Sequence, residues 1–259
     1  MKRCIRIYTQ CIKISISSIA AYRLNFFSTL IITFLNNLLI PLIMILAYKN
    51  GASIPGYSFN EILLIQSVFM LCTGICAPFL NNFVWSTMDH IKDGTYDMLL
   101  LKPGSVIFIS IASSFEISNI GTFISGMLVF IYSLCFFRPD FINTVQFIFL
   151  FMTGVLVELS FILLMAATTF KFVGNGRIFE IYDTITTYGR YPTSIYKNIL
   201  PVITTYIVPV SMLGFFPASA LLGKSTPDMY IAIFFCILLF ILSILIFNRM
   251  IRSYQSAGG

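Results

Sequence analysis

The sequence contains apolar runs that are too long and continuous for a small soluble domain. Two of the clearest are residues 26–48, FFSTLIITFLNNLLIPLIMILAY, and residues 229–248, which are followed by Arg249 and Arg252. About 20 apolar residues in a helix cross the hydrocarbon core of a bilayer. A transmembrane β-barrel would instead alternate apolar and polar residues over segments of about ten. The runs therefore predict an all-α integral membrane protein.

The composition supports a single membrane domain over residues 1–259. Charged residues make up 10% of the chain, against roughly 25% in a typical soluble domain. Spans of about 20 residues leave little chain for a separate soluble domain. The net charge of +6 comes from basic residues at loop ends and near the N-terminus, a pattern typical of membrane topology rather than nucleic-acid binding.

The pattern predicts six transmembrane helices, an amphipathic interfacial helix and a re-entrant segment before the last span. Basic and apolar residues alternate with helical period over 3–23, although alternation at 12–16 also fits a short strand. Four prolines interrupt 178–222, so we expect a crossing at 178–196 and a re-entrant segment at 198–222. The remaining predicted spans cover residues 26–48, 59–80, 106–136, 144–170 and 229–248.

The distribution of Lys and Arg predicts the orientation. If the N-terminus is cytoplasmic, the inner segments carry more Lys and Arg than the outer segments, which is the usual bias. The C-terminal basic residues also favour a cytoplasmic C-terminus, so the number of spans is even. We therefore expect a multi-pass protein of the cell membrane with both termini in the cytoplasm.

The sequence lacks the motifs of a membrane-embedded enzyme. His90 is the single histidine, and there is no cluster of Cys and His that would predict a metal site. The stretch LLGKST, 221–226, is similar to the end of a phosphate-binding P-loop, but Ala218 stands where the first glycine is needed. We expect no metal and no cofactor in this chain, and no ATP hydrolysis by it.

Four polar side chains within the predicted spans are candidates for a substrate pathway. Glu116 and Glu158 are acids inside apolar runs, where carboxylates usually face protein or water. Asn36 and Asn37 lie in the middle of the first span and favour hydrogen bonds between helices. Each acid also fits, somewhat better, a protonated or hydrogen-bonded group that fixes helix packing.

Residues 86–104 form an unusually polar loop between the second and third spans. Gly94 suits the left-handed position that ends a helix, and Thr95 suits the N-cap of the next one. Asp97 falls in the first turn of that helix, and Pro103 ends it. A short helix with three consecutive leucines is predicted, and it needs a partner in lipid, in this chain or in a second protein.

The pattern I-x-x-G-x-x-D-x-x-L-L-x-P resembles the first cytoplasmic loop of type 2 ABC export permeases. RYPTSIY at 190–196 and FFPASALLG at 215–223 are similar to two further motifs of a branch of about 260 residues. The resemblance implies that the short helix is a coupling helix that contacts a nucleotide-binding subunit. Its candidate contact residues here are Ile91, Gly94, Asp97, Leu100, Leu101 and Pro103.

The resemblance also implies partners and an activity. It implies two ABC ATPase subunits that hold ATP and Mg²⁺, and a second permease chain, identical or related, in the membrane lipid. The permease would export a substrate by alternating access, and the apolar lining favours an amphipathic or lipid-like one. The residues alone leave two alternatives open: an ion-coupled secondary transporter that uses the intramembrane acids, and a non-transporting membrane scaffold.

Overall fold

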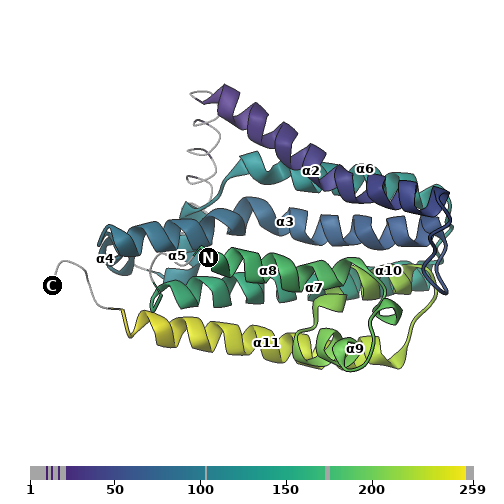
Figure 1. Cartoon of the computed structure of the whole chain (residues 1–259). Helices are drawn as coiled ribbons and strands as arrows, with labels where there is room; N and C mark the ends of the chain where they lie inside the picture. Colours follow the sequence, from purple (N-terminus) through teal and green to yellow (C-terminus); the bar gives the residue numbers. More distant parts are fainter. Residues whose placement is uncertain are drawn as a thin grey trace.

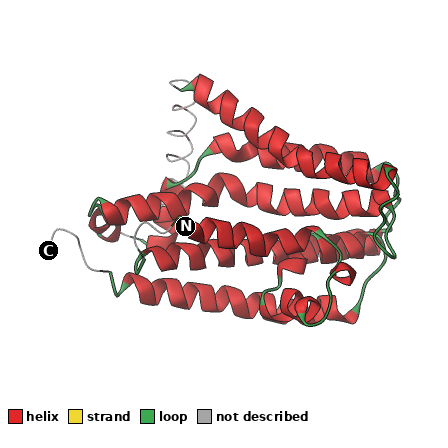
Figure 2. Ribbon diagram, in the orientation of Figure 1, coloured by secondary structure: helices red, strands yellow, loops and turns green. Residues whose placement is uncertain are grey.

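The computed structural model describes residues 10, 13, 17, 22–102, 104–172 and 176–254 (Figure 1). These residues are mainly helical, and Figure 2 shows no β-strand among them. The all-α membrane class is therefore confirmed. Five helical segments in the described part are long and apolar enough to cross a membrane: α2 (Arg23–Lys49), α3 (Phe59–Lys92), η1 with α6 (Ile117–Leu134), α7 (Phe141–Thr169) and α11 (Pro227–Ile251).

The long helices run side by side, with α3 at the centre (Figure 1). Helix α2 packs on α6, α6 on α3, α3 on α7, and α7 on α11. In the most apolar window of α3, 83% of the residues are buried, against 6% in α2. Helix α3 is thus a core helix, whereas α2 presents most of its surface outward.

The bundle has two distinct ends. The short helices α4 (Tyr96–Leu100) and α5 (Val106–Ser113) lie at one end, which we call the α4 end (Figure 1). The connections at 50–58, 135–140 and 222–226 lie at the other, which we call the far end. Two clusters of buried apolar side chains fill the interior, and only the second includes residues of α4.

The predicted third span, 106–136, is wrong as a continuous helix. Helix α5 ends at Ser113, and the helical path resumes only at η1 (Ile117–Ile120) and α6 (Gly121–Leu134). Serine hydroxyls compete for backbone carbonyls here, since Ser114 Oγ donates to the Ser110 carbonyl at 2.8 Å. The N–H of Glu116 donates to the Pro78 carbonyl of α3 at 2.7 Å. A tertiary hydrogen bond therefore replaces the helical one at the break.

Residues 178–196 do not form a helix of spanning length. Helix α8 (Arg177–Thr187) continues into η2 (Tyr188–Arg190), which gives roughly 21 Å of helix against a hydrocarbon core of about 30 Å. The irregular turn η3 (Thr193–Ile195) follows. A crossing at 178–196 stays a prediction, and it requires non-helical backbone after Arg190.

Residues 198–222 fold into short pieces that enter the bundle and return. They are α9 (Leu200–Val202), the π-helical η4 (Ile203–Ile207), η5 (Val210–Leu213) and α10 (Phe215–Leu221). Tyr206 contacts Asp228 at the start of α11, so the segment starts near the far end. The carbonyl of Met212 then lies against Gly154, roughly 20 Å along α7 from that end. The segment thus enters the bundle and returns, and its re-entrant placement in the membrane stays a prediction.

The predicted amphipathic helix at 3–23 falls largely outside the described residues. Within it the structure describes Gln10, Lys13, Ser17 and the residues from Tyr22 onward. Gln10, Lys13 and Ser17 are exposed, and each belongs to the polar face that the sequence predicts. The interfacial placement of this segment stays a prediction.

Candidate functional site

The loop between α3 and α5 forms a short helix, as the sequence predicts. Gly94 has φ +66°, the left-handed conformation that ends α3, and α4 begins two residues later. Thr95 occupies the N-cap position, but its hydroxyl makes no cap hydrogen bond. It lies 2.7 Å from Nδ1 of His90 instead. The predicted capping role of the Thr95 side chain is therefore wrong, and its contact ties α4 to the last turn of α3.

One face of α4 is anchored inside the protein. Tyr96 is fully buried, and its ring packs edge-on against Phe170 and Tyr254, with centroids 5.0 and 5.4 Å away. Burial raises the pKa of Tyr96 to about 12. Leu99 is also buried, and Leu100 packs partly against the same apolar cluster. These contacts fix the orientation of α4 on the bundle.

The opposite face of α4 presents apolar side chains to the outside. Met98 is 68% exposed and Leu101 is 84% exposed, with Asp97 partly exposed beside them. Of the predicted coupling residues, Leu101 therefore points outward, whereas Ile91 is buried. Met98 is not among the predicted contact residues, because five of the six positions from Tyr96 to Leu101 are apolar and show no helical period. Pro103 lies outside the described residues.

The two asparagines of α2 have different environments. Asn37 donates to the hydroxyl of Thr122 on α6 at 3.1 Å and to the Thr33 carbonyl at 2.8 Å. The predicted interhelical hydrogen bond is thus present for Asn37. Asn36 is exposed on the outer surface of α2. The two neighbours therefore do not form one polar site.

Glu116 lies at the break between α5 and η1. Its carboxylate accepts a hydrogen bond of 2.6 Å from Ser118, while its backbone N–H is held by α3. The side chain is half-buried. The contacts described for Glu116 support a role in shaping the broken helix.

Glu158 lies within the bundle, where it is 2% exposed. The hydroxyl of Tyr182 on α8 donates to its Oε1, and its Oε2 has no hydrogen-bond partner within the described residues. Tyr182 was not predicted as a partner of Glu158, because the two residues are 24 positions apart on different helices. Glu116 and Glu158 thus each have a partner of their own, and the structure does not bring them together in one contact.

Helix α8 carries polar residues along its outward side. Four exposed positions recur at helical spacing: Glu180, Asp183, Thr184 and Thr187. The inward side includes Tyr182 and the buried Thr186. Close to its end, the Arg190 guanidinium lies 4.7 Å from the centroid of the Phe69 ring. This helix therefore combines a buried acid contact with an unusually polar surface.

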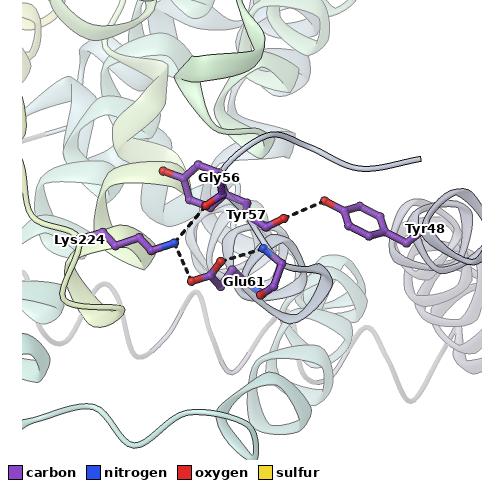
Figure 3. Close-up of polar contacts among 6 residues, drawn as sticks. Tyr48, Gly56, Tyr57, Glu61 and Lys224 are labelled. Carbon is purple, nitrogen blue, oxygen red and sulfur yellow. Dashed lines mark hydrogen bonds and ion pairs between the residues drawn. The ribbon is translucent and has the colours of Figure 1, made fainter. Parts of the chain in front are cut away.

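The far end is closed by polar contacts within the chain (Figure 3). Lys224 Nζ lies 2.7 Å from Glu61 Oε1 and 3.2 Å from the Gly56 carbonyl, above the ring of Tyr57. Glu61 also forms a capping box with Ser58 at the start of α3. The lysine of the P-loop-like stretch therefore links the turn before α11 to α3.

Comparison with protein families gives one match. A model described as ABC-2 family transporter protein matches residues 30–258. The chain belongs to this family. It is a multi-pass transmembrane permease of an ABC transporter, a type of machine in which a separate ATPase subunit hydrolyses ATP. No curated protein and no solved structure matches the chain.

Proposed function

We propose that the permease exports an amphipathic or lipid-like substrate by alternating access. Two ABC ATPase subunits, with ATP and Mg²⁺ bound, drive it, and a second permease chain completes the membrane pore. The permease lies in the cell membrane. Both of its termini are in the cytoplasm, because that orientation places more Lys and Arg on the cytoplasmic side. In this orientation the α4 end faces the cytoplasm and the far end faces outward.

The observation that carries the proposal is the divided surface of α4. Tyr96 and Leu99 hold the helix on the bundle, while Met98 and Leu101 extend outward beside Asp97. Exposed apolar side chains on a rigid helix at the end of a membrane bundle form a surface that a groove on another protein can bury. The ATPase subunit is the partner that the family requires.

Charge substitution on the outward face of α4 tests the coupling contact. The double variant Met98→Asp, Leu101→Asp is expected to lose co-purification with the ATPase subunits while its helix content and melting temperature are retained. Phe141→Asp is the matched control, because Phe141 is 83% exposed at the far end. Normal recovery of the ATPase with the double variant, or equal loss with the control, would contradict the contact.

The polar side of α8 supports a place for this helix in the pathway. Glu180, Asp183, Thr184 and Thr187 are exposed in the single chain, and polar groups that face lipid are costly. A position beside a second chain and a water-filled pathway would solvate them. Of the predicted pathway residues, Glu158 is the one that contacts α8, through Tyr182.

Accessibility to a thiol reagent tests this placement. In a cysteine-free background, Thr184→Cys in the assembled transporter is expected to react with a polar maleimide. Leu238→Cys on α11 is the control, since Leu238 is also exposed in the single chain but lies on an apolar helix. Equal lack of reaction at both positions would contradict a solvated α8 surface. Transport that survives ATP depletion would contradict the ATP-driven mechanism itself.

A further inference from the structure

A cavity of about 220 Å³ lies between α3, α7 and α8, close to the α4 end. Aliphatic side chains of α3 and α7 line its inner part, among them Val84 and Ile162. The rest of the lining includes Trp85 from α3 and Phe179, Tyr182 and Asp183 from α8. The cavity thus has a mixed lining of apolar side chains, aromatic rings and one carboxyl group.

Three aromatic side chains line this cavity. The rings of Trp85 and Phe179 are stacked, with centroids 4.4 Å apart and planes 8° from parallel. Tyr182 lines the cavity with its hydroxyl committed to Glu158. The faces of such rings carry negative electrostatic potential and attract cations, with tryptophan the strongest of the three.

The charges around the cavity also favour a cation. Asp183 contributes a carboxyl group to the lining, whereas no Lys or Arg lines it among the described residues. Arg190 interacts electrostatically with Asp183 from two turns further along the chain. Its guanidinium, however, lies over the Phe69 ring. No ion pair joins Arg190 and Asp183 in the described residues, so the Asp183 carboxyl group can still contact a ligand.

We propose that this cavity binds a hydrophobic organic cation, in which an ammonium group is attached to an apolar body. The ammonium would lie between Asp183 and the Trp85 and Phe179 rings, and the apolar body would contact the aliphatic wall. A bare metal ion is a poor fit, since no group of three His, Cys, Asp or Glu that could hold one occurs in the described part. That this ligand is also transported rests on the proposed function, whereas binding does not.

The chain contains its own reporter for this site. Trp85 is the single tryptophan in the sequence, so its fluorescence reports on this cavity alone. The full chain is reconstituted in phosphatidylglycerol liposomes, which contain no tryptophan, and titrated with benzyltrimethylammonium. Benzenesulfonate, an anion of similar size, is titrated in parallel. We expect saturable quenching by the cation and none by the anion.

Two variants distinguish a direct contact between the cation and the Asp183 carboxyl group from a general effect of negative charge on the affinity. Asp183→Asn is expected to weaken cation binding roughly tenfold, because it removes one charge-assisted contact. Glu180→Gln removes an acid from the same side of α8 without touching the cavity lining, so it should change the affinity less than about twofold. Circular dichroism spectra verify that both variants keep the helix content of the parent chain.

The result decides the proposal in each case. Equal quenching by cation and anion, no saturable quenching by the cation, or an unchanged affinity in Asp183→Asn overturns it. Repeating the titration in liposomes that contain phosphatidylethanolamine distinguishes two sources of the ammonium group. Competition by this lipid identifies a lipid headgroup as the ligand, and no competition identifies a free amphiphile. ATPase association is measured separately, so loss of the proposed function and loss of this site give different results.

Discussion

The two ends of the bundle differ in whether their surface side chains have partners within the chain. At the far end, Lys224 is paired with Glu61 and the Gly56 carbonyl, so the chain supplies its own partners. At the α4 end, Met98 and Leu101 are apolar and exposed, so the chain leaves them without cover. Phe141 is also exposed at the far end, but the polar side chains there are paired within the chain, and the difference supports the proposed contact of α4 with another protein.

The two faces of α4 should respond very differently to truncation. Leu99→Ala is expected to lower the free energy of unfolding by about 2–5 kcal/mol, because it removes buried methyl groups and leaves a cavity. Leu101→Ala should change stability by no more than about 0.5 kcal/mol. Thermal unfolding in detergent, followed by circular dichroism, measures both. Similar losses in the two variants would show that α4 is not divided into an anchored and an outward face.

Close backbone contacts hold the inner part of 198–222, and glycine substitution tests them. A Cβ on Gly189 would lie 2.4 Å from the Val210 carbonyl oxygen, so Gly189→Ala should cost about 1–3 kcal/mol. A Cβ on Gly176, at the other end of α8, meets nothing within 4 Å. Gly176→Ala is therefore the matched control, and it should leave the melting temperature nearly unchanged. If the two variants melt alike, η5 does not pack against η2 as described.

The far-end ion pair should contribute less than either of these contacts. Lys224→Met removes it, but the lysine side chain is 40% exposed and solvent weakens the attraction. The expected loss of stability is at most about 1 kcal/mol, and it should shrink as salt is added. Lys49→Met is the control, because Lys49 makes no ion pair within the described residues. A loss that is larger or independent of salt would mean that the pair is effectively buried.

The features that the sequence predicts well are those that depend on local pattern. Apolar runs of about 20 residues located the long helices, and Gly94 located the end of α3. In each case, composition and backbone preference along the chain determine the structure directly.

The features that the sequence does not predict depend on contacts across the bundle. The helix breaks before Glu116 because its N–H bonds to the Pro78 carbonyl on another helix. Glu158 pairs with Tyr182, whose inward position depends on how α8 is rotated against α7. Met98 faces outward because Tyr96 and Leu99, on the other face of α4, are buried in the core. The periodicity of residues along the sequence does not specify which side chains of different helices meet in this way.

Asp97 provides the finest test of the α4 end. It lies in the first turn of α4, where a negative charge next to the helix N-terminus stabilises by about 0.3–1 kcal/mol. If that is its only role, Asp97→Asn should lower the melting temperature slightly and leave ATPase stimulation in the assembled transporter nearly intact. Asp89→Asn is the control, because Asp89 is an exposed acid at the same end, 3.8 Å from Lys92. Loss of ATPase stimulation in Asp97→Asn alone would place this carboxylate in the contact with the ATPase, and the surface around Met98 and Leu101 would then be polar at its edge.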